Sequence, residues 1–205
     1  MTDGLQGLRD DVAFMRGLAE EGRNTPLLGG SISLAAGLAF GTGSLITYAV
    51  LKRWLDVPPQ AISWIWIAAA VPFFAVLIGA SRRLNGQAGA NSGANRANGA
   101  AWTAAGFAVF ALFGAFILGS ARTGEWIIMA LLPPVILALY GAAWAVAAAM
   151  TNQGWIRLVA SGTLVLAVAC GWLAGTAEQY LVYGAALLLF AAVPGAVLMR
   201  QARAA

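Results

Sequence analysis

Six long apolar stretches occupy most of the 205-residue chain and constrain its fold more than any other feature. Each is close to the ~20 helical residues that cross the ~30 Å hydrocarbon core of a membrane. The charged residues fall outside these stretches or at their extreme ends. We therefore predict six transmembrane helices, at residues 27–51, 61–80, 101–119, 126–150, 156–175 and 180–199.

The composition agrees with a chain that is surrounded by lipid. Hydrophobic residues make up 60% of it and charged residues 10%, whereas soluble domains have about 45–50% and about 25%. So few charges cannot cover a water-facing surface, and in lipid a helix satisfies its own backbone groups. The predicted fold class is therefore all-α, a polytopic membrane protein with the lipid bilayer as its main partner.

Several kinds of chemistry have no residues to carry them. The chain has no histidine and one cysteine, Cys170, and no Asp, Glu, Lys or Arg lies in the middle of a predicted span. Pumps, ion channels and proton-coupled carriers usually place such groups there. The H-E-x-x-H, P-loop and G-x-S-x-G motifs do not occur. We predict no catalytic residue, no cofactor and no metal, and no nucleic-acid partner because a basic, aromatic patch is missing.

Basic residues are distributed unevenly over the two sides of the membrane. If the N-terminus is cytoplasmic, nine lie inside: Arg9, Arg16, Arg23, Arg82, Arg83, Arg96, Arg157, Arg200 and Arg203. Three lie outside: Lys52, Arg53 and Arg122. Because positive loops stay in the cytoplasm, we predict that both termini are cytoplasmic. The loop 81–100, rich in Gly, Asn and Ala, is predicted to be a flexible cytoplasmic connector, and residues 200–205 a basic cytoplasmic tail.

Residues 1–26 are predicted to form an amphipathic cytoplasmic helix and a connector. Apolar residues recur there at spacings of three and four: Leu5, Leu8, Val12, Met15 and Ala19. The stripe can dock on the chain's own bundle, bind a cytoplasmic partner or lie on the membrane surface. Three Arg against five acidic residues on the polar face argue against the anionic membrane surface.

The sequence LAEEGRNTPLLGG, at residues 18–30, leads directly into the first predicted span. It resembles the start of small multi-span bacterial inner-membrane proteins. The resemblance implies a bacterial inner membrane and carries no activity with it.

Small residues form stripes on two of the predicted helices. In the first span Gly29, Ser33, Gly37 and Gly41 recur at every fourth position, and in the fifth span Gly171 and Gly175 continue the pattern. Such stripes allow the backbones of membrane helices to approach closely. They favour packing within the chain and leave a homo-oligomer interface as the alternative.

Prolines occur inside each even-numbered span: Pro72, Pro133, Pro134 and Pro194. A proline has no amide hydrogen and leaves the carbonyl four residues earlier without its helical donor. The freed carbonyls are those of Ala68, Met129, Ala130 and Phe190. Broken helices of this kind serve some transporters, but proline kinks also occur in spans that transport nothing.

The functional expectation follows from the lack of charged residues in the middle of the spans. It also follows from two surfaces suited to helix contacts, the apolar stripe of the N-terminal segment and the small-residue stripe of the first span. We expect a non-catalytic accessory, scaffold or regulatory subunit that acts through helix–helix contacts with itself or with a membrane-complex partner. The alternative is a small carrier or channel for a neutral or weakly polar solute, in which the proline-kinked helices and the hydroxyl groups of the first span line the path.

Overall fold

The computed structural model describes residues 12, 26–84, 86–87, 89–151 and 153–204. All elements in these residues are helical, and six helical stretches are long and apolar enough to cross a membrane. The predicted all-α six-helix fold is confirmed. In chain order the elements are α2 Gly30–Leu51, α3 Ala61–Leu84, α4 Gly93–Thr123, η1 Trp126–Leu131, α5 Leu132–Met150, α6 Gly154–Trp172, α7 Ala177–Leu187, η2 Leu188–Ala192 and α8 Val193–Ala204.

The predicted N-terminal helix lies almost wholly outside the described residues. Of its apolar stripe, Val12 is described, as a helical and exposed residue. Leu5, Leu8, Met15 and Ala19 are not, so the three interpretations of this segment stay predictions.

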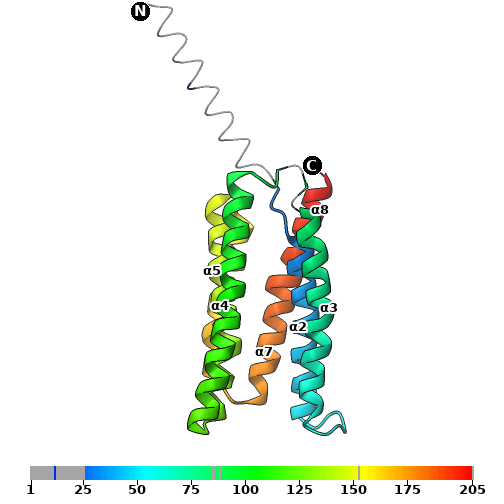
Figure 1. Ribbon diagram of the computed structural model, residues 1–205, viewed down its shortest axis with the longest axis vertical. Helices are drawn as coiled ribbons and strands as arrows, with labels where there is room; N and C mark the ends of the chain where they lie inside the picture. The colour runs from blue at the N-terminus through cyan, green and yellow to red at the C-terminus, as the bar shows by residue number, and fades with distance from the viewer. Residues whose placement is uncertain (1–11, 13–25, 85, 88, 152, 205) are drawn as a thin grey trace, which may run out of the picture.

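The helices form a ring that is open on one side (Figure 1). Neighbours pack in the order α4, α5, α6, α7–α8, α2 and α3, and the ring does not close because α3 packs extensively only on α2. The fifth and sixth spans, although consecutive in the chain, have different main neighbours. Helix α6 packs mainly on α5, whereas the continuous sixth span α7–η2–α8 packs mainly on α2.

Two buried apolar clusters hold the ring together. The first surrounds Trp144 of α5 and includes Leu27, Ile156 and Leu198. The second joins Leu137 of α5 and Cys170 of α6 to Tyr183 and Leu187 of α7, among others. The C-terminal span therefore connects the α4–α5–α6 side of the ring to the α2–α3 side.

The predicted flexible loop 81–100 is shorter in the structure, because α3 continues to Leu84 and α4 begins at Gly93. The Ser92 hydroxyl caps α4 by accepting from the Asn95 amide at 3.2 Å. The Asn95 side chain also accepts from the Leu28 amide at 2.8 Å and donates to the Pro26 carbonyl at 3.0 Å. A sequence without apolar periodicity thus forms a helix start, since its asparagines bind the chain that enters α2.

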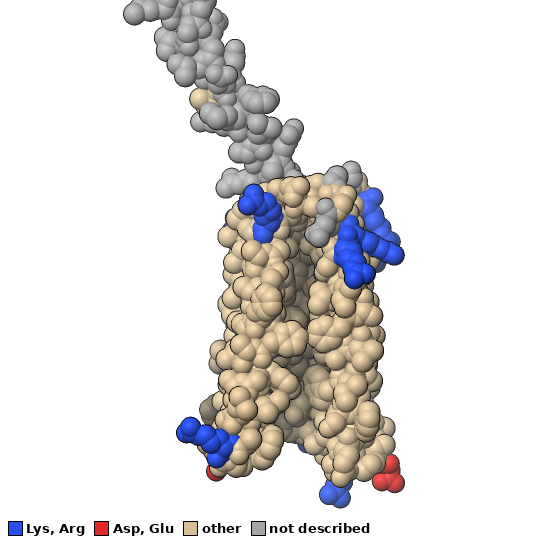
Figure 2. All heavy atoms as spheres, in the orientation of Figure 1, with Lys and Arg blue, Asp and Glu red and all other residues tan. Residues whose placement is uncertain are grey.

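The two ends of the bundle carry different charges (Figure 2). At the end with the C-terminus, the charged described residues are all basic: Arg82, Arg83, Arg96, Arg157, Arg200 and Arg203. At the opposite end, basic and acidic residues balance: Lys52, Arg53, Arg122, Asp56, Glu125 and Glu178. The charges that suggested an orientation from sequence are therefore separated in space by the length of the helices.

Candidate functional site

The small residues of α2 face the C-terminal span at very short range. A Cβ atom added at Gly37 would lie 2.7 Å from the Ala192 Cβ and would also overlap the Ala192 backbone. One added at Gly30 would lie 2.7 Å from the Gly195 carbonyl oxygen. The contact is reciprocal, because a Cβ at Gly184 would lie 2.9 Å from the Gly41 carbonyl oxygen. Real Cβ atoms do not come this close to other atoms. The contact between α2 and the C-terminal span, which we call the α2 seam, therefore requires glycine at these positions.

Two serine hydroxyls of α2 donate hydrogen bonds across the same seam. The Ser33 hydroxyl donates to the Ala191 carbonyl at 2.9 Å, and the Ser44 hydroxyl donates to the Tyr180 carbonyl at 2.7 Å. The structure thus places Ser33, Gly37 and Gly41 between two helices of one chain. This part of the predicted stripe is not available as a surface for another molecule.

The other predicted small residues lie in different settings. Gly29 precedes α2 as its N-cap with φ 94°, and Gly175 lies in the turn between α6 and α7 with φ 84°. A left-handed backbone conformation favours glycine whether or not another helix is close. These two positions therefore belong to helix ends and not to a packing stripe. A Cβ added at Gly171 would meet Pro134 at an ordinary 3.7 Å.

The prolines mark changes of helix type as well as helix interiors. Pro72 lies inside α3. Pro133 and Pro134 lie in the first turn of α5, directly after the 3₁₀ helix η1. Pro194 lies in the first turn of α8, directly after the π-helical stretch η2. A missing amide hydrogen costs little in a first helical turn, so the fourth and sixth spans change helix type where a sharp kink was expected.

Three of the four carbonyls predicted to be freed have donors in the structure. The Gln179 side-chain amide donates to the Ala130 carbonyl. The Trp144 indole N–H donates to the Phe190 carbonyl at 3.0 Å, and the Leu132 amide donates to the Met129 carbonyl. Two of these carbonyls therefore join one helix to another, and the third is bonded within its own span.

Gln179 and Trp144 are the two residues of this arrangement that the sequence did not single out. Gln179 is 0% exposed and also accepts from the Gly175 amide at 3.1 Å, which ties it to the α6–α7 turn. Trp144 is 1% exposed. Two signals in the sequence were available. Gln179 is a lone amide beside a predicted span, and Trp144 is a tryptophan in the interior of a span instead of at its edge.

If the Trp144 indole serves the Phe190 carbonyl because Pro194 has no amide hydrogen, substitutions of Trp144 and Pro194 should have coupled effects on stability. Replacing Trp144→Phe leaves the Phe190 carbonyl without this donor, and we expect a loss of about 1–2 kcal/mol in unfolding free energy. Replacing Pro194→Ala restores an amide hydrogen that can donate to the same carbonyl. The loss from Trp144→Phe should therefore be smaller in the Pro194→Ala background, as measured by a double-mutant cycle in lipid bicelles.

Trp172→Phe is the matched control for this cycle, because Trp172 is 89% exposed. It should leave the unfolding free energy nearly unchanged. Equal losses from Trp144→Phe in both backgrounds would show that the indole does not serve the carbonyl that Pro194 leaves open.

The open side of the ring forms a furrow between α3 and α4, visible along the front of the bundle in Figure 2. The two helices approach at Phe74 and Phe110, whose rings stack with centroids 6.0 Å apart. Helix α3 packs extensively on one neighbour, α2, and 6% of its most apolar window is buried. The furrow therefore combines bulky apolar side chains with a helix that has few partners inside the chain.

The acidic residues of the described chain lie at the end of the bundle opposite the C-terminus. No group of three His, Cys, Asp or Glu side chains within the described residues could hold a metal ion. Glu178 instead forms an ion pair with Lys52 that joins α7 to the end of α2. This hydrogen bond raises the pKa of Lys52 above its ordinary value. The same hydrogen bond lowers the pKa of Glu178. The pair's small contribution to stability is therefore present at neutral pH, and it is lost in strong base when Lys52 deprotonates and in acid when Glu178 is protonated.

Neither a protein-family model, nor a curated protein, nor a solved structure matches the chain. The described residues offer two features of functional interest: helix breaks whose carbonyls accept hydrogen bonds from the chain's own donors, and an apolar outer surface with a furrow.

Proposed function

We propose that the chain is a non-catalytic membrane protein, an accessory, scaffold or regulatory subunit that acts through helix–helix contacts. The single observation that carries this proposal is the open ring, in which α3 packs extensively on α2 alone while the furrow between α3 and α4 faces outward. We place the protein in a bacterial inner membrane with both termini in the cytoplasm. This orientation is supported by the end of the bundle near the C-terminus, where every charged residue that the structure describes is basic.

The closed interior supports a role without chemistry or transport. Buried polar side chains such as Ser44, Thr47, Thr163 and Gln179 all donate to backbone carbonyls of the chain. Among the described residues, the buried side-chain polar atoms without a partner are Ser120 Oγ and Gln201 Oε1, and both lie in the last turn of a helix. The hydrogen-bonding groups of the interior are thus mostly engaged within the chain. We therefore assign the function to the outer surface.

The furrow is suited to a transmembrane helix of a partner subunit. Glycines along its two helices are open: a Cβ added at Gly79, Gly106 or Gly114 would meet nothing within 4 Å. Open glycines in a membrane helix permit a second backbone to approach. Glycines of α2 are therefore already in contact with another helix of the chain, whereas these glycines of α3 and α4 are free to contact a second molecule.

Single cysteines test whether a protein occupies the furrow. Val71 of α3 and Phe107 of α4 are 65% and 72% exposed, and Val168 of α6 is a matched control at 76%. After cross-linking in native membranes, we expect an adduct of larger mass from Val71→Cys and Phe107→Cys but not from Val168→Cys. The mass identifies the neighbour as a different protein or as a second copy. Equal adducts from all three positions, or none from any, would exclude the furrow as the contact.

The alternative function, a carrier or channel for a neutral solute, has less support. Its path would run along the carbonyls released by the prolines, and three of these accept hydrogen bonds from Gln179, Trp144 and the Leu132 amide. A solute would have to displace buried donors of the protein. Uptake of a neutral solute into vesicles that contain the purified full chain would favour this alternative over the subunit.

A further inference from the structure

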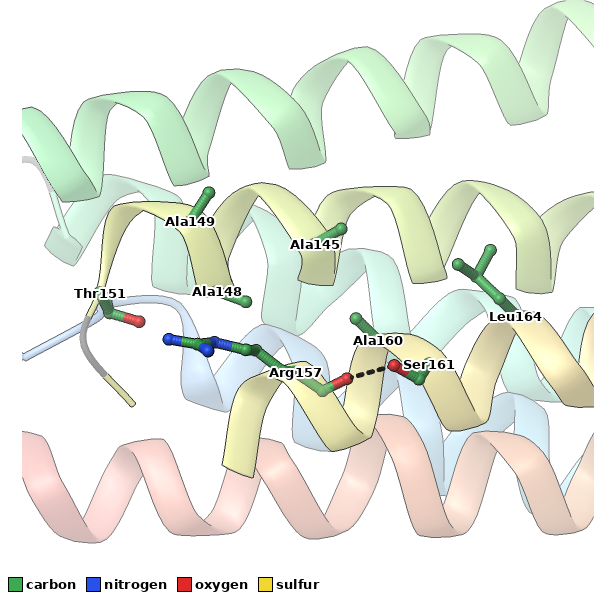
Figure 3. A pocket seen from close by; sticks show the side chains of 8 residues that line it. All are labelled: Ala145, Ala148, Ala149, Thr151, Arg157, Ala160, Ser161 and Leu164. Carbon is green, nitrogen blue, oxygen red and sulfur yellow. Dashed lines mark hydrogen bonds between the residues drawn. The ribbon is translucent and has the colours of Figure 1, made fainter. Parts of the chain in front are cut away.

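A pocket of about 470 Å³ lies between α5 and α6, near the wholly basic end of the bundle (Figure 3). Half of its eight lining residues are alanine: Ala145, Ala148 and Ala149 on α5 and Ala160 on α6. The volume falls within the ~300–1,000 Å³ of typical ligand sites. The alanines keep the two helices close while leaving a smooth apolar hollow on the outer face of the bundle.

Arg157 supplies the charge of this pocket. Its side chain extends between the two helices toward Thr151 (Figure 3). Among the residues that the structure describes, it forms no ion pair, and the other charges at this end of the bundle are also positive. The hydroxyls nearby are engaged as donors, Ser161 to the Arg157 carbonyl at 2.8 Å and Thr151 to the Ala147 carbonyl at 2.9 Å. The guanidinium is thus the group that is left to bind a ligand, and it selects an anion.

The position of Arg157 along α6 sets its depth in the membrane. It is the fourth residue of a 19-residue helix, so it lies about 5 Å from the helix start at 1.5 Å per residue. That depth corresponds to the headgroup region, where phosphates are found. The first turn of α6 also presents the positive end of the helix dipole. From there the alanine walls lead inward to Leu164, at the depth of the acyl chains.

We propose that this pocket binds an anionic phospholipid. The guanidinium of Arg157 binds the phosphate, for which its planar fork of N–H donors is well matched, and the alanine walls hold the first part of an acyl chain. Basic pockets between helices on the cytoplasmic side are suited to such headgroups. The site lies on α5 and α6, away from the furrow between α3 and α4, and is independent of what occupies that furrow.

The test uses the purified full chain in detergent and counts bound lipid by native mass spectrometry. The probes are phosphatidylglycerol, which is anionic, and phosphatidylcholine, which has the phosphate but no net charge. We expect tighter binding of phosphatidylglycerol, and a loss of about fivefold or more in its affinity for Arg157→Gln, as follows from ~1 kcal/mol per basic residue near the lipid surface. Ala149→Leu, which fills the pocket without changing charge, should also weaken binding.

Two controls separate the pocket from the general charge of the surface. Arg203→Gln removes a charge at the same end outside the pocket, and Ala75→Leu enlarges an exposed alanine on α3. Both should bind phosphatidylglycerol like the unaltered chain. Equal losses from Arg157→Gln and Arg203→Gln, or normal binding by both pocket variants, would overturn the site. Displacement of the lipid by millimolar inorganic phosphate would assign the pocket to a soluble phosphate and overturn the lipid assignment.

Discussion

Replacing Gly37→Ala should cost about 2–3 kcal/mol in unfolding free energy, which is the range for overpacking a closely fitted contact. The new methyl group would lie 2.7 Å from the Ala192 Cβ and would overlap the Ala192 backbone. Backbone cannot move aside as the end of a flexible side chain can, so α2 and the C-terminal span must separate. Unfolding by SDS in lipid bicelles, followed through tryptophan fluorescence, measures the loss.

Gly106→Ala is the matched control for this substitution. A Cβ at Gly106 would meet nothing within 4 Å, and alanine is the better helix former. The control should therefore be neutral or slightly stabilising within the chain. A Gly37→Ala protein as stable as the Gly106→Ala protein would show that α2 and the C-terminal span are not in close contact.

Replacing Gln179→Leu should also cost about 2–3 kcal/mol, because it keeps a side chain of similar size and removes two buried hydrogen bonds. The Ala130 carbonyl would lose its donor and the Gly175 amide its acceptor. The same bicelle unfolding experiment measures the effect. Structural change should appear at the α6–α7 turn and at the start of α5, since Gln179 joins these two places.

Gln60→Leu controls for the general effect of the exchange, because Gln60 is an exposed residue of the segment between α2 and α3. It should change the unfolding free energy little. If Gln179→Leu is equally harmless, the carbonyls at the helix breaks do not depend on side-chain donors. The interior would then be less tightly closed than we infer, and the carrier alternative would gain support.

The fold was largely predictable because each span is marked by a long run of apolar residues. About twenty consecutive apolar residues have few structures open to them in lipid, and the ends of the spans are marked by charges such as Lys52 and Arg122. The α2 seam could be predicted as a stripe of glycines but not assigned to a partner. That assignment depends on which helix faces Gly37, a question of tertiary packing that spacing along one helix does not determine.

The closed helix breaks were only half predictable. The rule that a proline releases a carbonyl four residues earlier correctly identified Ala130 and Phe190 as groups in need of donors. It does not tell where those donors lie, because Gln179 and Trp144 are 49 and 46 residues away along the chain. The start of α4 was missed for a similar reason. Asn95 stabilises it by bonds to Pro26 and Leu28, which are distant in sequence.

These observations connect the fold to the proposed role. The seam of α2, the ties of Gln179 and Trp144 and the two apolar clusters make a bundle whose interior is occupied by its own side chains. What remains open lies on the surface, as the furrow beside α3 and the alanine pocket beside Arg157. A bundle that is packed in this way and has an apolar outer surface fits the proposed role of holding other membrane components in place.

The most direct test of this role is the mass of the particle that surrounds the chain in its native membrane. The full chain is extracted with its lipids by a membrane-solubilising polymer, without detergent, and weighed by native mass spectrometry. We predict a stoichiometric complex with a second protein or a second copy, and its loss when Val71 and Phe107 are both replaced by lysine. A particle that contains a single 21.1 kDa chain and lipid alone would contradict the proposal that this protein works as a subunit.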